Sequence, residues 1–363
     1  MSNPKSILSV IGARPHFIKA APFMEAMRKS RYRVITIHSG QHYDPNMSDI
    51  FFQELGLPNP EINLGIGSGT HAHQTAQVLV GIEKMIHEHK PEAVVVYGDT
   101  NTTLGAALAA AKEYVPLVHI EAGVRCGNRR MPEEINRTLI DSMATYLACP
   151  SEQSVHNLLN EGVTGRIENI GDLMYDTFLK ANAAADKAEF KLEIYGVDKD
   201  NYILSTLHRE ETTASPDVLK NVLDTLGSLE YPVLLPMHPR TRARLVTAGI
   251  PLDRSDGLRI LDPVGYIEMI NLVRRSRLVL TDSGGLQKES FWAGVPCVTM
   301  MNETTWTEII ASGWSTLSGL CPDRIRAAVD GFEKNPPPTY LNPTDLYGHA
   351  GAAQRLVKGL GWL

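Results

Sequence analysis

Three carboxylates in the sequence stand where proton transfer could take place. Asp99 and Glu121 each follow a short apolar run, 93–97 and 117–120, and Glu133 comes 12 residues after Glu121 in MPEEINR. A single carboxylate in such a place is more often a helix cap or an ion-pair partner. Because Asp99 and Glu121 end neighbouring predicted strands, we expect them to share one rim, where paired carboxylates can have their pKa values driven apart. The pair therefore indicates one acid and one base, without naming a reaction.

The segment TDSGGLQKE, residues 281–289, could bind a phosphate and a ribose. An apolar run ends there, and a helical pattern begins at Ser283, Gly284 and Gly285. Glycines let backbone N–H groups approach a phosphate, and a helix start adds free donors and a favourable dipole. Glu289 lies about one turn into that helix, where its carboxylate could accept ribose hydroxyls. The alternative is an ordinary strand-to-helix turn with a polar cap, and the segment matches neither a Walker A loop nor GxGxxG.

Cations and imidazoles stand at three further strand ends. Arg14 and Lys19, in GARPHFIK, begin a predicted helix whose dipole would favour acids, so a bound anion explains them better than a surface role. His208 and His238 each follow a predicted strand; either could contact a phosphate, and His208 could donate a proton. The alternative for each is a structural, hydrogen-bonded histidine. A separate histidine cluster within 71–89 lacks carboxylates or cysteines at ligand spacing and predicts no metal site.

The elements that must position these residues are predicted to alternate between strands and helices along the chain. Short β-branched runs alternate with amphipathic stretches, which is typical of parallel sheets covered by helices. Ligands of such sheets bind at the carboxyl ends of the strands, and two such domains face to face would enclose a cleft. We place the domain boundary near Asn169. The expected strands are 7–11, 34–38, 93–97, 117–120, 202–206, 233–236, 258–261, 278–281 and 297–300, and the expected helices are 15–27, 73–87, 103–112, 216–229, 266–275 and 286–293.

Length, charge and composition exclude several classes of protein. The 363 residues suffice for two domains, and 43% of them are hydrophobic and 21% charged, as in globular proteins. The 35 basic and 41 acidic residues are interspersed, which argues against a nucleic-acid partner. No apolar stretch reaches the roughly 18–20 residues of a membrane span, and the N-terminal run is too short for a signal peptide. Four cysteines without a CxxC pair argue against a disulfide framework or structural zinc and fit a reducing cytoplasm.

Taken together, the motifs resemble the non-hydrolysing UDP-N-acetylglucosamine 2-epimerase family over essentially the whole chain. In order they are GARPHFIKAAP, SGQHYD, YGDTNTTLGAALAA, HIEAGVR, MPEEINR, TLHREE and DSGGLQKE followed by GVPCV. The resemblance implies a glycosyltransferase-B-like fold of two Rossmann-like domains facing across a cleft. Residues 1–168 would form the sugar and acid/base side, 169–345 would bind UDP, and 346–363 would pack back on the first domain as a helix. A homodimer without cofactor or metal is expected.

The resemblance also implies roles for individual residues. The implied acid/base groups are Asp99, Glu121, Glu133 and His208. The implied substrate-binding residues are Arg14, Lys19, Arg137, His238, Ser283, Gly284, Gly285 and Glu289. Within this set, the turn at Ser283 would hold the diphosphate, and Glu289 would hold the ribose.

The implied reaction inverts the sugar at C2 by elimination and re-addition of UDP. The C2 hydrogen of an N-acetyl sugar is not acidic, so the C1–O bond must break first, which builds oxocarbenium character and makes C2–H labile. A glycal intermediate then takes UDP back after a proton reaches C2 from the opposite face. Inversion needs acid/base groups on both faces, and the departing diphosphate needs cations and a helix N-terminus. The product, UDP-N-acetylmannosamine, would serve surface polysaccharide synthesis.

Two segments depart from the commonest bacterial pattern. RCGNRRMP, residues 125–132, is shorter and more basic than the usual loop, and TTWTE, 304–308, replaces a TTERPE stretch. Both look more like the relatives that epimerise UDP-2,3-diacetamido-glucuronic acid, whose extra carboxylate would suit Arg129 or Arg130. We expect UDP-N-acetylglucosamine, the parent substrate of the family, with this uronate as the alternative. QHYD, 41–44, in place of a QHR-type motif, predicts no activation by a second UDP-N-acetylglucosamine.

Three rival functions would suit the same scaffold. A glycosyltransferase would need an acceptor site and has less use for three carboxylates. A hydrolysing epimerase would release free UDP with time. A non-catalytic nucleotide-sugar sensor would keep the turn at Ser283 and Glu289 but would have no reason to hold the carboxylates together.

Overall fold

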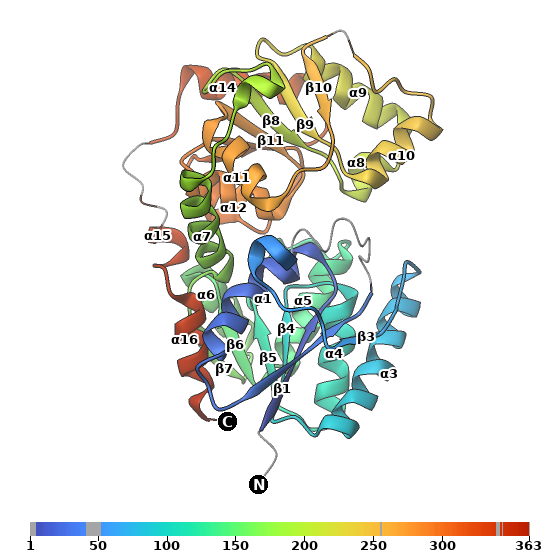
Figure 1. Ribbon diagram of the computed structural model, residues 1–363, viewed down its shortest axis with the longest axis vertical. Coiled ribbons are helices and arrows are strands. Elements are labelled where there is room, and N and C mark those ends of the chain that lie inside the picture. Colours follow the sequence, from blue (N-terminus) through green and yellow to red (C-terminus); the bar gives the residue numbers. More distant parts are fainter. Residues whose placement is uncertain (1–4, 41–51, 255, 339–341, 343, 363) are drawn as a thin grey trace. The chain divides into compact units, whose positions relative to one another are not determined.

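The computed structural model describes residues 5–40, 52–254, 256–338, 342 and 344–362, so the QHYD residues 41–44 lie outside it. The chain divides into two compact units, Met1–Leu179 with Thr344–Leu363, and Lys180–Pro343 (Figure 1). This division falls within helix α7 (Leu173–Lys187), on the C-terminal side of the boundary that the sequence placed near Asn169.

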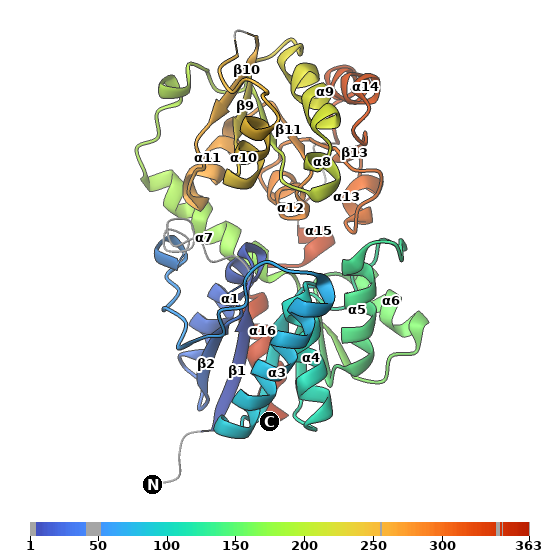
Figure 2. The same cartoon turned by 90° about the vertical axis from the view of Figure 1, so that its right-hand side faces the viewer.

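The first unit is built on a parallel sheet with the strand order β3-β2-β1-β4-β5-β6-β7. Figure 2 shows two of its paired strands, β1 and β2. The strands β1, β4 and β5 consist wholly of buried residues, as strands covered by helices on both faces must. The strands of this unit are β1 (Ser6–Ile11), β2 (Arg33–His38), β3 (Ile62–Asn63), β4 (Ala93–Tyr97), β5 (Leu117–Ile120), β6 (Tyr146–Cys149) and β7 (Arg166–Asn169). Its helices, besides the start of α7, are α1 (Arg14–Met27), α3 (His71–His89), α4 (Asn101–Lys112), α5 (Pro132–Met143), α6 (Glu152–Glu161), α15 (Thr344–Tyr347), α16 (Ala352–Gly359) and the 3-10 turn η2 (Leu360–Trp362).

The strand order of this sheet brings the predicted chemistry to one edge. β1 lies between β2 and β4, and such a switch point leaves a crevice at the carboxyl ends of the strands. β4 and β5 pair directly, with Tyr97 opposite Ile120. Asp99 and Glu121 therefore follow adjacent strands at the same end of the sheet, and Arg14 follows β1 at that end.

The C-terminal helix returns to the first unit, as the resemblance implies. α16 packs against α1. The backbone N–H groups of Gly351 and Ala353 donate to the Asp176 carboxylate at 2.7 and 2.9 Å. An acid at a helix N-terminus satisfies free donors and complements the helix dipole, so it fixes the start of α16.

The second unit repeats the architecture with the strand order β10-β9-β8-β11-β12-β13, again all parallel. β8 and β11 pair with Thr206 opposite Thr281, which sets the turns after them side by side. Its strands are β8 (Ile203–Thr206), β9 (Val233–Pro236), β10 (Leu258–Leu261), β11 (Leu278–Thr281), β12 (Cys297–Thr299) and β13 (Ser315–Leu317). Its helices are α8 (Glu210–Thr213), α9 (Pro216–Gly227), α10 (Pro239–Thr247), α11 (Tyr266–Arg275), α12 (Gly284–Trp292), α13 (Thr307–Ala311), α14 (Pro322–Lys334) and the 3-10 turn η1 (Leu192–Tyr195).

The two sheets confirm the predicted α/β class of two Rossmann-like domains. Within the described ranges, no helix has both the length and the apolar character of a membrane-spanning segment.

Candidate active site

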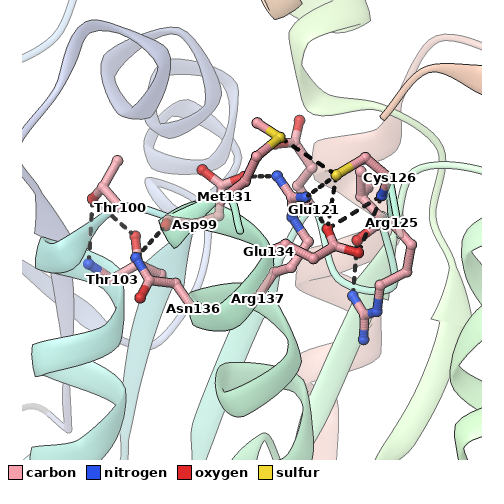
Figure 3. Close-up of polar contacts among 12 residues, drawn as sticks. Asp99, Thr100, Thr103, Glu121, Arg125, Cys126, Met131, Glu134, Asn136 and Arg137 are labelled. Carbon is pink, nitrogen blue, oxygen red and sulfur yellow. Dashed lines mark hydrogen bonds and ion pairs between the residues drawn. The ribbon is translucent and has the colours of Figure 1, made fainter. Parts of the chain in front are cut away.

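The Asp99 carboxylate is paired with the Arg137 guanidinium at the carboxyl end of β4 (Figure 3). Asn136, next to Arg137 on α5, donates from Nδ2 to the backbone carbonyl of Asp99 at 2.8 Å. The Arg137 side chain is only 6% exposed, whereas that of Asp99 keeps 28%. Burial alone would lower the pKa of Arg137, but the carboxylates of Asp99 and Glu134 outweigh it and raise that pKa. Asp99 is therefore a partly exposed carboxylate held by a buried, permanent cation.

The two glutamates of MPEEINR have different surroundings. Glu134 is buried, pairs with Arg137, and accepts hydrogen bonds from the backbone N–H groups of Cys126 and Gly127 (Figure 3). Burial alone would raise the pKa of Glu134, but these N–H groups and the guanidinium lower it. Glu133 is half-buried in the first turn of α5, and its carboxylate makes no hydrogen bond or ion pair with the described residues. Glu134 thus stabilises the turn at Cys126 and Gly127. Of the two glutamates, only Glu133 has a carboxylate without a hydrogen bond or ion pair to the described residues.

Lys19 and Glu121 form a nearly buried ion pair at the carboxyl end of β5. Lys19 Nζ lies 2.5 Å from Glu121 Oε1, and the two side chains are 5% and 12% exposed. Glu121 has a left-handed backbone with φ of 71°, which is uncommon for a residue with a side chain. Both residues line a small pocket of the first unit together with Ile120, Ala148, Pro150, Ile170, Gly171, Asp172 and Leu173.

Gly98 lies directly against this ion pair. Its φ is 61°, and a Cβ at this position would stand 3.3 Å from Lys19 Nζ and 3.5 Å from Glu121 Oε1. Gly98 directly precedes Asp99 in the chain, so the backbone of the turn that carries Asp99 passes beside the Lys19–Glu121 ion pair. Glycine is needed here both for the backbone conformation and for the close approach.

His16 connects the turns after β1 and β4. Its Nδ1 accepts a hydrogen bond from the backbone N–H of Gly12 at 3.1 Å, and its Nε2 lies 3.4 Å from Thr100 Oγ1. Since Nδ1 accepts, Nε2 carries the proton and donates to the threonine hydroxyl. Arg14 begins α1 in the same turn and is partly exposed. The turn that bears Arg14 is therefore fastened to the residue that follows Asp99.

In the second unit, Asp282 holds the His208 imidazole. His208 Nδ1 lies 3.1 Å from Asp282 Oδ1, and the backbone N–H groups of His208 and Arg209 both donate to the same carboxylate. Asp282 is fully buried, whereas 44% of the His208 side chain is exposed. With Nδ1 directed at the carboxylate, the other ring nitrogen, Nε2, is the one left for proton transfer or an anion.

The predicted phosphate turn begins α12 next to Asp282. Ser283 caps the helix, with its side chain accepting from the backbone N–H of Leu286 at 3.4 Å. Gly284 and Gly285 are the first residues of α12, where N–H groups have no acceptor within the helix. The buried Glu289 carboxylate accepts a hydrogen bond from Tyr266 Oη at 2.8 Å. The polar cap expected as the alternative is thus present, and it leaves the helix start able to bind an anion.

His238 occupies the position expected of a structural histidine. It caps α10, with Nδ1 accepting a hydrogen bond from the backbone N–H of Arg240 at 3.1 Å. The histidines of the separate cluster lie on α3, where His87 pairs with Glu113. Among the described residues, no three His, Cys, Asp or Glu side chains gather as a metal site would require.

Sequence reasoning located the turns and missed several side chains that brace them. These are His16, Glu134, Tyr266 and Asp282. A carboxylate directly after a strand signals Asp282, which stands in the quoted DSGG motif. Nothing in the sequence marks Tyr266, because its partner Glu289 is 23 residues away on another helix.

Replacing Asp282 by Asn should make the thermal stability of the protein less sensitive to low pH. Burial alone would raise the pKa of Asp282, but the His208 imidazole and two backbone N–H groups lower it below its ordinary 3.8. The carboxylate thus contributes stability that is complete above about pH 4 and is lost as the pH falls through the folded-state pKa. D282N should have a lower Tm than wild type at neutral pH and a smaller fall in Tm between about pH 5 and pH 2 by calorimetry. The exposed Asp262→Asn serves as control, and equal falls in wild type and D282N would contradict the prediction.

Comparison with known proteins identifies the family. Residues 25–361 match the family model described as UDP-N-acetylglucosamine 2-epimerase. The chain belongs to the UDP-N-acetylglucosamine 2-epimerase family. This confirms the resemblance drawn from the motifs.

Members of the epimerase family resemble the chain over nearly its full length. UDP-2,3-diacetamido-2,3-dideoxy-D-glucuronate 2-epimerase of Pseudomonas aeruginosa is 44% identical, over 98% of this chain and 99% of its own. UDP-N-acetylglucosamine 2-epimerase of Methanocaldococcus jannaschii is 38% identical, over 96% and 97%. The crystal structure of the M. jannaschii UDP-GlcNAc 2-epimerase in complex with UDP-GlcNAc and UDP matches with a TM-score of 0.91 and 37% identity, over 99% of this chain and 100% of that one. The fold of this chain is therefore that of the epimerase family.

Proposed function

We propose that the chain is an isomerase that interconverts UDP-N-acetylglucosamine and UDP-N-acetylmannosamine. The observation that supports this most strongly is a pair of carboxylates, Asp99 and Glu121, at the ends of adjacent strands, each bound to a cation. The epimerases that match along the whole chain support it independently. An enzyme that inverts a carbon needs proton-transfer groups of this kind on both faces of that carbon.

The proposed reaction proceeds by elimination and re-addition. The C1–O bond breaks, its electron pair leaves with UDP, a carboxylate accepts the C2 proton, and the C1=C2 double bond of the glycal forms. A second proton-transfer group on the opposite face then delivers its own proton to C2, and a diphosphate oxygen bonds to C1 again. In this scheme Asp99, Glu121 and Glu133 supply the proton-transfer groups. Arg137 and Lys19 hold the first two carboxylates in place.

The second unit supplies groups suited to UDP. Charge that develops on the diphosphate is stabilised by donors fixed in advance, such as the N–H groups at the start of α12. His208, held by Asp282 through Nδ1, presents its other nitrogen as a donor or proton carrier. Glu289 accepts the ribose hydroxyls, and His238 contributes to substrate binding through the ring nitrogen that does not cap α10. Arg14, at the start of α1 in the first unit, is assigned to substrate binding as well. No metal or other cofactor is part of this proposal.

UDP-2,3-diacetamido-glucuronate is the second candidate substrate, because the 44% identical relative is named for it. The extra carboxylate of that sugar calls for a cation. Arg125 is already engaged, by Asp141 and by Glu161. Arg129 and Arg130 are exposed, and neither side chain forms an ion pair with the described residues. These two arginines are therefore the ones to replace when the two substrates are compared.

Proton NMR of the protein with each UDP-sugar in deuterated water tests the proposal. Deuterium at C2, together with a second anomeric signal and no free UDP, would establish a non-hydrolysing 2-epimerase and identify the sugar. Accumulating UDP would instead indicate a hydrolysing enzyme or a glycosyltransferase. Binding of UDP-sugar without exchange at C2 for either sugar would leave a sensor and contradict the proposal. Sedimentation of the same sample tests the expected homodimer.

Replacing Tyr266 by Phe should weaken the binding of UDP with little effect on turnover. The change removes a donor from the buried carboxylate proposed to hold the ribose, and a hydrogen bond to a charged group contributes about 1.5–3 kcal/mol. The Kd for UDP and the KM should therefore rise at least about tenfold, while kcat stays near the wild-type value. Calorimetric titration with UDP measures the first. A lower kcat with unchanged Kd would show that Glu289 acts elsewhere.

A further inference from the structure

A cluster of charges with a fully buried centre lies behind the two carboxylate-bearing turns of the first unit. Its centre is His119 on β5, which is 0% exposed and next but one to Glu121. His119 Nδ1 lies 2.6 Å from the Asp141 carboxylate, which is also 0% exposed. Arg125 binds the same carboxylate at 2.7 Å and extends the cluster to Glu161.

The partners of His119 fix its charge state. Nδ1 faces the carboxylate of Asp141, and Nε2 lies 2.8 Å from the backbone carbonyl of Gly98. Neither a carbonyl nor an ionised carboxylate can donate, whereas a neutral imidazole has one N–H for two acceptors. The ring must therefore carry a proton on both nitrogens. The two positive charges of His119 and Arg125 then balance the two negative charges of Asp141 and Glu161.

Asp141 is ionised in this arrangement. Besides His119, its carboxylate accepts from the Arg125 guanidinium and from the backbone N–H of Gly123 at 3.1 Å. Burial alone would raise the pKa of Asp141, but the imidazole and the guanidinium outweigh it and lower that pKa. The alternative, a protonated Asp141 donating to a neutral His119, would surrender these charge-assisted contacts.

The cluster forms hydrogen bonds with the backbone of both turns that carry the rim carboxylates, Asp99 and Glu121. The Gly98 carbonyl belongs to the peptide bond that joins Gly98 to Asp99, and His119 binds it directly. The Gly123 N–H lies two residues beyond Glu121, and Asp141 binds it. Both turns contain residues with a left-handed backbone, with φ of 61° at Gly98 and 71° at Glu121. The contacts with His119 and Asp141 help to maintain this uncommon conformation.

We infer that His119 is a positioning residue of the reaction, whose imidazole, with both ring nitrogens engaged, fixes the turns of Asp99 and Glu121 relative to each other. The inference rests on the proposed function, because it concerns the groups that exchange the C2 proton. His119 itself is fully buried and acts through the Gly98 carbonyl and the Asp141 carboxylate. A displacement of about 1 Å between reacting groups can cost about 100-fold in rate.

The replacements His119→Gln and His119→Asn test this inference. An amide side chain has one NH2 group and one oxygen, so it can donate to Gly98 or to Asp141 but meets the other acceptor with its oxygen. At a temperature where the variant is folded by circular dichroism, we expect kcat to fall by about 100-fold. The Kd for UDP should be unchanged, because the start of α12, His208 and Glu289, which are proposed to bind the diphosphate and ribose, belong to the second unit. His87→Gln, at an exposed ion pair of α3, is the matched control and should keep wild-type kcat.

Nitrogen-15 NMR of the wild-type protein supplies a second measurement that does not depend on the variants folding. The inference requires two protonated ring nitrogens on His119 at neutral pH. A single N–H, or a folded H119Q with wild-type kcat, would overturn it while leaving the proposed function standing. A wild-type protein inert toward both UDP-sugars would overturn the proposed function, and the role assigned to His119 with it.

Discussion

Replacing Asp99 by Asn is expected to abolish epimerisation while leaving the fold and UDP binding intact. The amide has the size of the carboxylate, and its oxygen can still accept from the Arg137 guanidinium. It cannot take up a proton, and losing a proton-transfer group costs about 10²–10⁴-fold in rate. The measurement is deuterium exchange at C2 together with formation of the second anomer.

The D99N experiment also separates an enzyme from a sensor. A non-catalytic nucleotide-sugar sensor would have no need of this carboxylate, so its ligand response would survive D99N. Asp262→Asn, at a 91% exposed position of the second unit, is the matched control. Exchange at C2 that proceeds in D99N at the rate of the control would remove Asp99 from the mechanism.

Replacing Glu121 by Gln is expected to reduce both activity and stability. Activity should fall by about 10²–10⁴-fold, as for any lost proton-transfer group. Stability should fall because Lys19, only 5% exposed, would lose its counter-charge, and breaking one side of a buried pair costs about 3–5 kcal/mol. Thermal unfolding and C2 exchange give the two readouts.

A double replacement separates the two effects of Glu121. Removing the charge of Lys19 as well, in the variant K19M/E121Q, should restore much of the stability, since an apolar side chain can replace a buried ion at little cost. It should restore no activity, because no carboxylate returns. Glu61→Gln is the control within the same unit: its pair with Arg33 is 40–59% exposed and should contribute less than about 1 kcal/mol. Restored activity in the double variant would show that Glu121 serves only to neutralise Lys19.

The sequence predicts most strands, and those it misses lie both inside the sheets and at their edges. The edge strand β10 is confirmed at both ends, whereas the buried internal strand β6 was not predicted. β1, β4 and β5 are mostly apolar, although β1 contains two serines and β5 contains His119, and their positions are confirmed within one residue. β7, with the sequence RIEN, carries charges that an edge strand tolerates, and β13 has three residues. Such segments form because a neighbouring strand offers free hydrogen bonds, a tertiary effect with no local pattern.

The candidate site follows a similar division. Strand ends could be located from the sequence, so Asp99, Glu121 and His208 were found. Their partners lie 38, 102 and 74 residues away in the chain, at Arg137, Lys19 and Asp282. No periodicity indicates which cation meets which carboxylate, because that pairing is decided by strand order. The order itself depends on packing of the whole sheet.

The left-handed backbone of Glu121 has a consequence for the stability of the first unit. A side chain in that conformation costs about 1–2 kcal/mol, a cost that glycine avoids. Exchanging Glu121 for glycine and Lys19 for an apolar residue should therefore make the first unit more stable. The same exchange would remove a carboxylate from the rim, so at this position backbone strain and the proposed chemistry oppose each other.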